Sequence, residues 1–177
     1  MRQKLFCILL FLILFLCHDL IAQWTPGPGN QDTLTLSLLS GGYVSFKYTS
    51  IDAVENGITY TNWTNFNLYF DDEDNDDQVK LTCYANTANL DGEQSNTMAL
   101  SQIEVRAICS GCSGDVTQTS WQTLTTSPGV DLLTGIEGSV GGGSLNYNIY
   151  IDYRCGNSGL INQPNDYYYV DIIFDVE

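Results

Sequence analysis

The chain has 177 residues, and six Lys and Arg against 21 Asp and Glu give it a formal net charge of −15. So acidic a protein repels phosphate backbones and anionic lipid surfaces, which argues against nucleic-acid binding and peripheral membrane binding. Its single histidine, His18, lies in an N-terminal apolar segment. The rest of the chain therefore has no histidine for a Ser-His-Asp triad, a Cys-His dyad or a His-ligated metal.

Residues 1–22 have the pattern of a cleavable signal peptide. Arg2 and Lys4 precede an unbroken apolar run over 5–16, and Ala22 offers a small side chain at the cleavage point. We therefore expect an exported protein, secreted or held at the cell surface. Cleavage would leave 155 residues (177 less 22), with four basic and 20 acidic side chains and a charge of −16. That length suits a single domain that buries about 70% of its unfolded surface.

Two alternatives to a cleaved signal fit the residues less well. A retained membrane anchor needs about 20 apolar residues, and the run from Leu5 to Leu16 has 12. A lipoprotein signal at Cys17 needs a small residue before it, where this chain has Leu16. After signal cleavage we expect no membrane insertion.

Alternation of apolar and polar side chains dominates the chain after a Pro/Gly-rich extended arm at 23–32. It predicts a hairpin of strands 34–38 and 44–48 around Ser40-Gly41-Gly42, and Asn56-Gly57 predicts a further turn. The later strands are expected to bury one face each: Phe66, Leu68 and Phe70; Val79, Leu81, Cys83 and Ala85; Ile103, Val105, Ala107 and Cys109; Leu145, Tyr147, Ile149, Ile151 and Tyr153; and Val170, Ile172, Phe174 and Val176.

These patterns predict an all-β domain over 33–177, an antiparallel β-sandwich of eight or nine short strands. No window shows a 3.6-residue apolar stripe, and helix-favouring residues are scarce, with one helical turn at most over 96–102. A small barrel is the alternative that alternation permits, but the uneven loops favour a sandwich.

The run 71–77 places six carboxylates in seven residues. Oxygen ligands at alternate positions, Asp72, Asp74 and Asp76, suit Ca²⁺, which extracellular modules bind at about 10⁻⁴–10⁻³ M. The spacing is not that of an EF-hand, because Asp77 stands where the EF-hand has its glycine. The alternative is a solvated tip between two strands. Calcium is the one cofactor that the sequence suggests.

Four cysteines follow the signal, and an even number in an oxidising compartment favours two disulfides, with three connectivities to choose from. Cys109 and Cys112 have the spacing of a redox motif, but such motifs begin a helix, whereas this pair follows a strand pattern. Cys83 and Cys155 share the core phase of their strands. We therefore favour the pairs Cys83–Cys155 and Cys109–Cys112, although Cys109 also has inward phase.

The sequence contains no catalytic motif that we recognise. Residues 135–144 hold five glycines without the Lys-Ser/Thr of a phosphate-binding loop, and no Gly-x-Ser-x-Gly elbow occurs. Paired carboxylates can hydrolyse glycosides without histidine, but the acidic residues here fall in turns and at solvent positions, where nothing raises a pKa. We therefore expect no enzymatic activity.

Three Trp and 11 Tyr make the chain rich in flat side chains, most of which we assign to packing between strands. Tyr167 and Tyr169 are out of phase with the last strand and should be exposed. Together with Trp63 and Tyr69, which precede the acidic run, they are our candidates for binding a sugar or a protein. Asn62 also begins a glycosylation sequon, which matters only in a eukaryotic protein.

Several features resemble bacterial surface proteins. The Ala-Gln junction at residue 22 is similar to the signal ends of secreted proteins from the Bacteroidetes. Residues 66–71 followed by 79–82 resemble the strand, Asp-rich turn and W-x-L-T strand of WxL-type and spore-coat-U-type domains, with Val79 in place of the tryptophan. The ending 166–172 is similar to the closing strand of pilin-like sandwiches, with Asp166 in place of a glycine.

The resemblance implies an exported immunoglobulin-like subunit of a surface structure, and it carries over no catalytic residue. We therefore expect a structural or adhesive role in a pilus-like or coat assembly, with copies of itself, other surface proteins or glycans as partners. In a pilin-type mechanism an extended segment of one subunit completes a sheet of the next, and the arm 23–32 or the strand 33–39 could supply it. The alternative is a calcium-assisted module that binds carbohydrate or protein.

Overall fold

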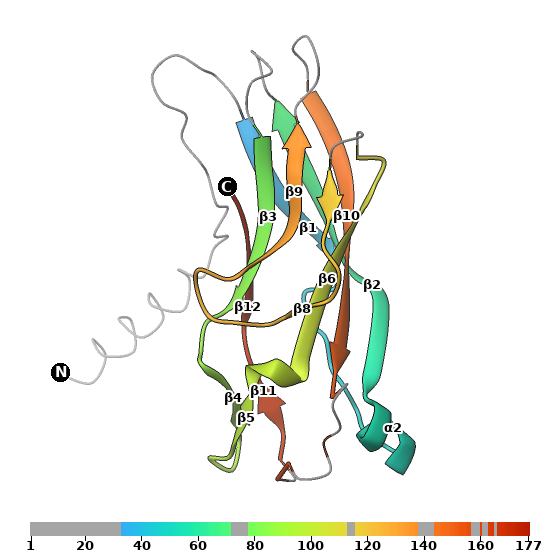
Figure 1. The fold of residues 1–177 in the computed structure, drawn as a ribbon, viewed down its shortest axis with the longest axis vertical. Helices are drawn as coiled ribbons and strands as arrows, with labels where there is room; N and C mark the ends of the chain where they lie inside the picture. Colours follow the sequence, from blue (N-terminus) through green and yellow to red (C-terminus); the bar gives the residue numbers. More distant parts are fainter. Residues whose placement is uncertain are drawn as a thin grey trace, which may run out of the picture.

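The computed structural model describes residues 33–71, 78–112, 116–137, 144–156, 160, 163–164 and 166–177. These residues form an elongated body of antiparallel strands with one short helix and one 3-10 turn (Figure 1). The elements are β1 (Thr33–Ser40), α2 (Ile51–Asn56), β2 (Ile58–Asp71), β3 (Gln78–Ala85), β4 (Asn89–Gly92), β5 (Thr97–Ala99), η1 (Leu100–Gln102), β6 (Ile103–Ser110), β7 (Thr117–Gln118), β8 (Gln122–Thr123), β9 (Val130–Glu137), β10 (Ser144–Cys155), β11 (Tyr168–Tyr169) and β12 (Ile172–Val176).

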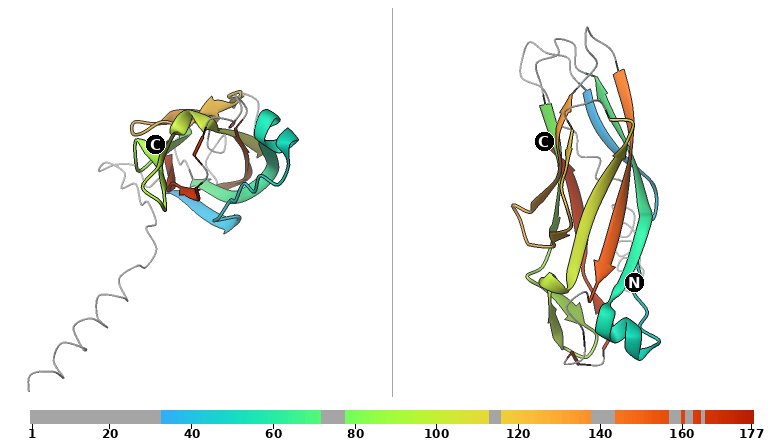
Figure 2. Two further views of the ribbon diagram at one scale, coloured as in Figure 1. Left: turned by 90° about the horizontal axis from the view of Figure 1, so that it is seen from below. Right: turned by 45° about the vertical axis from the view of Figure 1, so that its right-hand side comes forward.

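Two larger sheets face each other around one core, as the view from below in Figure 2 shows. One sheet has five strands in the order β1-β2-β10-β6-β8, and the other has four in the order β12-β3-β9-β7. A small sheet, β11-β4-β5, lies at the end of the body that also carries α2 (Figure 1). The all-β prediction is therefore confirmed, in a sandwich-like arrangement.

Two-residue alternation located the core correctly, because successive side chains of a strand point to opposite faces of its sheet. The predicted positions of β2, β3 and β6 are all buried, and so are four of the five in β10, Tyr147, Ile149, Ile151 and Tyr153. The fifth, Leu145, is partly buried, as are Val170, Ile172 and Phe174 near the chain end. Cys83 and Cys155 both point into the core, as predicted.

The predicted hairpin of 34–38 with 44–48 is wrong. β1 pairs with β2 instead, Leu34 opposite Phe70 and Leu38 opposite Phe66, and residues 41–49 form no strand. The reason lies at Gly41, which has a positive φ of 76° and packs so closely on the backbone of Trp63 that a Cβ atom would overlap its carbonyl oxygen. The glycine therefore serves a close backbone approach rather than a hairpin turn.

Gly57 also has a different role from the predicted one. It ends α2 with a φ of 76°, and its N–H donates to the carbonyl of Ala53. The Ser50 side chain begins the same helix, because its Oγ accepts a hydrogen bond from the Ala53 N–H at 3.1 Å. A cap at each end allows six residues to form a helix that buries no side chain.

Asp166 fastens the small sheet. Its carboxylate accepts hydrogen bonds from the Gln94 N–H at 3.0 Å, the Asn96 side chain at 2.9 Å and the Tyr167 N–H at 2.7 Å. Partial burial opposes ionisation of this carboxyl, but the hydrogen bonds outweigh it and lower its pKa. The site is tight, since a Cβ atom at Gly92 would collide with the Asp166 carboxylate. Asp166 therefore anchors the segment that enters β11 to the turn between β4 and β5.

Candidate functional site

The structure does not bring the four predicted binding residues together. Trp63 lies in the first half of β2, where its side chain is 40% exposed. Tyr69 lies near the far end of the same strand, six residues away or roughly 20 Å, with its hydroxyl donating to Asp71 at 3.2 Å. Tyr167 and Tyr169, 78% and 61% exposed, belong to the end with the small sheet, and their predicted exposure is confirmed.

The predicted calcium ligands Asp72, Asp74 and Asp76 lie outside the described residues. Within the part of the chain that the structure describes, no group of three or more Asp, Glu, His or Cys side chains could hold a metal ion. The calcium site stays a prediction.

Trp63 is part of a surface group of rings that the sequence did not suggest. Tyr60 lies next to it, with ring centroids 4.7 Å apart, and Phe46 stacks on Tyr60 at 5.2 Å. Tyr43 follows on the neighbouring segment and is 78% exposed. We call these four residues the aromatic patch. They come from β2 and from the segment 41–49 that runs beside it.

Hydrogen bonds to main-chain carbonyls orient the rings of the aromatic patch. The Trp63 indole N–H donates to the Tyr43 carbonyl at 2.7 Å, and the Tyr60 hydroxyl donates to the Ser45 carbonyl at 3.1 Å. The Thr64 hydroxyl donates to the Gly41 carbonyl at 2.6 Å. Three side chains of β2 thus hold the segment 41–49, which has no strand pairing of its own.

A bulge in β2 makes the contact between Tyr60 and Trp63. Residues three apart on a regular strand point to opposite faces, so their rings could not meet. Here Thr64 lies opposite Ile151 and Tyr60 lies opposite Tyr153, so β2 carries two more residues than β10 across this interval. Asn62, inside the bulge, has a positive φ of 52°, a conformation that Asn tolerates better than most residues.

Asp152, the β10 residue opposite the bulge, is fully buried. Its carboxylate accepts the Asn62 main-chain N–H at 2.7 Å and two hydrogen bonds from Arg106, at 2.8 Å from Nε and 2.6 Å from Nη2. A buried carboxylate without partners would be strongly destabilising. Arg106 therefore balances the charge of Asp152 at one carboxylate oxygen, while the other oxygen holds the backbone of the bulge in place.

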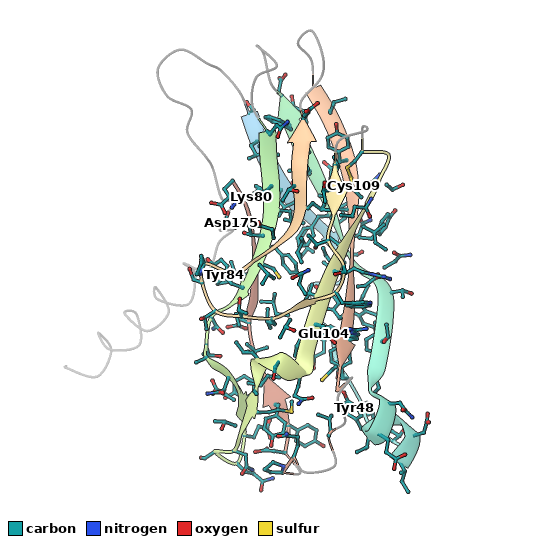
Figure 3. The ribbon with its side chains drawn as sticks, viewed as in Figure 1. Tyr48, Lys80, Tyr84, Glu104, Cys109 and Asp175 are labelled. Carbon is teal, nitrogen blue, oxygen red and sulfur yellow. A yellow bond between two sulfur atoms is a disulfide. The ribbon has the colours of Figure 1, made fainter. Side chains whose placement is uncertain are left out.

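Arg106 belongs to a second cluster, the arginine network. Its guanidinium carbon lies 4.7 Å from the centre of the Trp121 ring, and that of Arg154 lies 4.6 Å from the same ring. Arg154 also makes a two-pronged ion pair with Glu104, with both hydrogen bonds under 3 Å (Figure 3 labels Glu104). With Asp152 as the second acid, two carboxylates balance two guanidinium groups.

Sequence reasoning missed the arginine network. A usable signal was present, because these are the only two arginines after residue 22 and both fall at outward positions of strands, as does Asp152. Strand phase alone did not reveal that β6 and β10 are neighbours, which brings Arg106 opposite Asp152 and Arg154 opposite Glu104.

Only one of the two predicted disulfides is present. Cys109 and Cys112 form a disulfide (Figure 3 labels Cys109), whereas Cys83 and Cys155 are buried free thiols. The expected Cys83–Cys155 bridge is therefore wrong. Shared inward phase puts both thiols in the core without pairing them: Cys83 lies on β3 of the four-stranded sheet and Cys155 at the end of β10 in the five-stranded sheet. Burial raises the pKa of Cys83 to about 12, which keeps the thiol protonated and unreactive at neutral pH.

The edge of the five-stranded sheet is the other conspicuous surface. β1 spans eight residues, pairs with β2 alone among the described strands and contains neither a charged residue nor a proline. Leu38 and Leu39 near its end are 53% and 56% exposed. A register shift between Leu38 and Ser40 interrupts the ladder there, so the regular edge covers 33–38. Long uncharged edges of this kind readily pair with another strand.

Among the described residues no helix is both apolar enough and long enough to cross a bilayer. Comparison of the chain with protein-family models, with curated proteins and with solved structures finds no match.

Proposed function

We propose that this chain is an exported structural or adhesive subunit that works at the cell surface and associates with copies of itself through the outer edge of β1, which no other described strand covers. We also propose that its sandwich is of the immunoglobulin-like type found in pilin-like subunits. The signal-like N-terminus supports export, and the strongly acidic composition supports an extracellular setting in which solubility must be maintained at high local density.

The observation that carries the proposal is the contrast between β1 and the other edge strands of the two large sheets. β7 and β8 have two residues each, and β12 has five residues that include Asp175. Short length and charge are the usual protections of a sheet edge. β1, with eight uncharged residues, has neither protection.

Strand addition at β1 would proceed without unfolding the donor sheet. Two copies of Thr33–Leu38 can pair antiparallel, each keeping its contacts with β2, and join two five-stranded sheets into one. The arm 23–32 of another subunit is a second donor, although Pro26 and Pro28 lack the N–H groups that a long ladder needs.

The test is the mass of residues 23–177 in solution, measured by size-exclusion chromatography with light scattering over a range of concentrations. We expect species that grow in steps of one subunit. Ser37→Lys should reduce them, because a charged lysine on an edge strand opposes the addition of another strand beside it. Ser101→Lys, an exposed serine in η1, is the matched control and should assemble normally.

A second variant shows which segment, β1 or the arm 23–32, is the donor strand. Deleting 23–32 should leave assembly intact if β1 pairs with β1, and should abolish it if the arm is the donor. A sharp monomer at all concentrations in the unmodified chain would contradict self-association altogether.

A further inference from the structure

We propose that the aromatic patch is a binding site for a neutral saccharide chain. It uses Tyr43, Phe46, Tyr60 and Trp63, which differ from the β1 residues invoked for self-association, and it does not depend on that proposal. Four observations support it: the orientation of the rings, the single charge in the two segments that carry them, the small exposed ring area and the buried Asp152 that holds the bulge.

The presentation of Trp63 suits stacking. Its only polar group, the indole N–H, is already bonded to the Tyr43 carbonyl, so the exposed 40% of the side chain offers ring surface rather than a donor. The Tyr60 hydroxyl is likewise used by the Ser45 carbonyl. The C–H face of a pyranose ring is flat and apolar and stacks on such a surface, while its hydroxyl groups remain free for polar partners.

The surroundings supply neutral polar partners. In the two segments that build the patch, 41–49 and 58–64, Lys47 is the single charged residue. Ser45 and Thr61 are exposed and carry hydroxyl groups. Sugar hydroxyls pair with such groups, and the net charge of −15 would repel acidic polysaccharides. The expected ligand is therefore uncharged.

The exposed rings are few. One half-exposed tryptophan and one well-exposed tyrosine, Tyr43, offer much less surface than the roughly 1,000 Å² that a stable protein–protein interface buries. A small rigid ligand, which loses little entropy on binding, needs no more than this.

Asp152 provides the buried support. A fully buried, triply hydrogen-bonded carboxylate fixes the Asn62 N–H and with it the bulge that brings Tyr60 and Trp63 together. Binding sites gain affinity when a packed layer behind them fixes their geometry in advance. We assign Asp152 and Asn62 as positioning residues of the patch, since neither is needed to contact the ligand.

The experiment is calorimetric titration of residues 23–177 with three neutral probes, cellohexaose, chitohexaose and maltohexaose, at a protein concentration where light scattering shows a monomer. We expect saturable binding of at least one of them. Tyr43→Ala, in an exposed segment, and Trp63→Ala should each weaken it at least tenfold. Tyr167→Ala, which removes an equally exposed tyrosine at the other surface, should change it less than twofold.

A pair of substitutions at Asn62 tests the positioning role. Asn62→Gly tolerates a positive φ and should keep affinity within about threefold, whereas the β-branched Asn62→Val opposes that backbone and should lose tenfold or more. Ring contact is read independently from the near-ultraviolet circular dichroism of the Tyr60–Trp63 pair. A valine variant that retains both signals would refute the role of the bulge.

Two results would overturn the saccharide site. One is the absence of binding for all three probes at millimolar concentration in a folded protein. The other is binding that survives both Tyr43→Ala and Trp63→Ala. If those substitutions instead abolish self-association, the patch is a protein contact and the saccharide proposal fails, whereas the failure of Ser37→Lys to affect assembly would bear only on the β1 edge.

Discussion

Trp63 and Trp121 border the same five-stranded sheet, but their surroundings are chemically opposite. Trp121 lies against two guanidinium groups, each within 5 Å of its ring centre, and these are neutralised by Glu104 and Asp152. Trp63 has only aromatic and main-chain neighbours in the contacts described above. Cations thus lie against the ring of Trp121, whereas the ring of Trp63 contacts Tyr60 and remains 40% exposed. The difference separates a tryptophan that stabilises the sheet from one that can bind a ligand.

Asp152 joins the two regions. One side of its carboxylate holds Arg106 of the arginine network, and the other holds the backbone of the bulge that shapes the aromatic patch. A charged cluster can therefore support a neutral binding surface without contacting it. Substitutions that alter the arginine network, the aromatic patch, both or neither should therefore differ in their effects in solution.

Alkaline pH should have the largest effect, and it should act on the core, where Tyr153 lies opposite Tyr60 of the aromatic patch. Burial raises the pKa of Cys83 from 9.0 to about 12 and that of Tyr153, opposite Tyr60, from 10.0 to about 12. Because the pKa of each group is raised in the folded state, its contribution to the free energy of unfolding is fully present below the pKa of the unfolded state. That contribution is lost as the pH rises toward the folded-state pKa of about 12. For Cys83 alone the loss is on the order of 4 kcal/mol.

Urea unfolding at pH 8, 10 and 11 measures this loss, and Cys83→Ala is the control that removes one titrating group. The variant should show a shallower decline with pH than the unmodified chain. An unfolding free energy that stays constant from pH 8 to 11 would contradict the burial of these groups.

Replacement of Asp152 should have the next largest effect and should alter both tryptophans. Asp152→Ala leaves Arg106 and the Asn62 N–H without their partner, for which we expect a loss of about 3–5 kcal/mol in the free energy of unfolding. Asp152→Asn keeps an acceptor for Asn62 and should destabilise less. Denaturant unfolding measures the free energy of unfolding of both variants and of the unmodified chain. If all three were equally stable, the bulge would not need the carboxylate.

Reduction of the Cys109–Cys112 disulfide should have a smaller effect and leave both tryptophans unchanged. The bridge closes a very short loop, so the chain-entropy model predicts a loss of about 2 kcal/mol. Cys109→Ser/Cys112→Ser should behave like the reduced protein. In the native unreduced protein, alkylation followed by mass spectrometry should find Cys83 and Cys155 unmodified; rapid labelling of either would contradict their burial.

The smallest effect is a difference between the two tryptophans themselves. Trp121→Leu removes two cation–π contacts worth about 0.5–1 kcal/mol each, while Trp63→Leu removes ring contacts at a more exposed position. We expect Trp121→Leu to be the more destabilising by about 1 kcal/mol in thermal unfolding. Saccharide affinity should show the opposite order, with only Trp63→Leu reducing it.

Strand phase accounts for what could be predicted from the sequence. It located the buried faces of β2, β3, β6 and most of β10, because alternation depends only on the local chain. It did not reveal which strands are neighbours, so β1 was assigned to the wrong partner and Cys83 was paired with Cys155. Neighbour choice depends on the whole topology, which no local window contains.

The candidate site depends on features with even weaker local signals. Nothing in the sequence around Asn62 marks a bulge, and without it Tyr60 and Trp63 would lie on opposite faces. The exposure of Tyr167 and Tyr169 was predictable from phase, but Tyr43 and Phe46 of the aromatic patch come from the segment 41–49, of which 44–48 was predicted as a strand. Strand periodicity cannot predict a surface that depends on a bulge, because the bulge interrupts the alternation.

The attachment of segment 41–49 has a consequence for how the protein can change over evolution. Backbone contacts fasten it at Gly41, and at its other end the Tyr48 hydroxyl donates to the Cys155 carbonyl at 2.8 Å (Figure 3 labels Tyr48). Between these anchors the exposed side chains, such as Tyr43 and Lys47, contribute nothing to the core. They are free to vary while the frame persists, so relatives of this protein can acquire new binding preferences without rebuilding the fold.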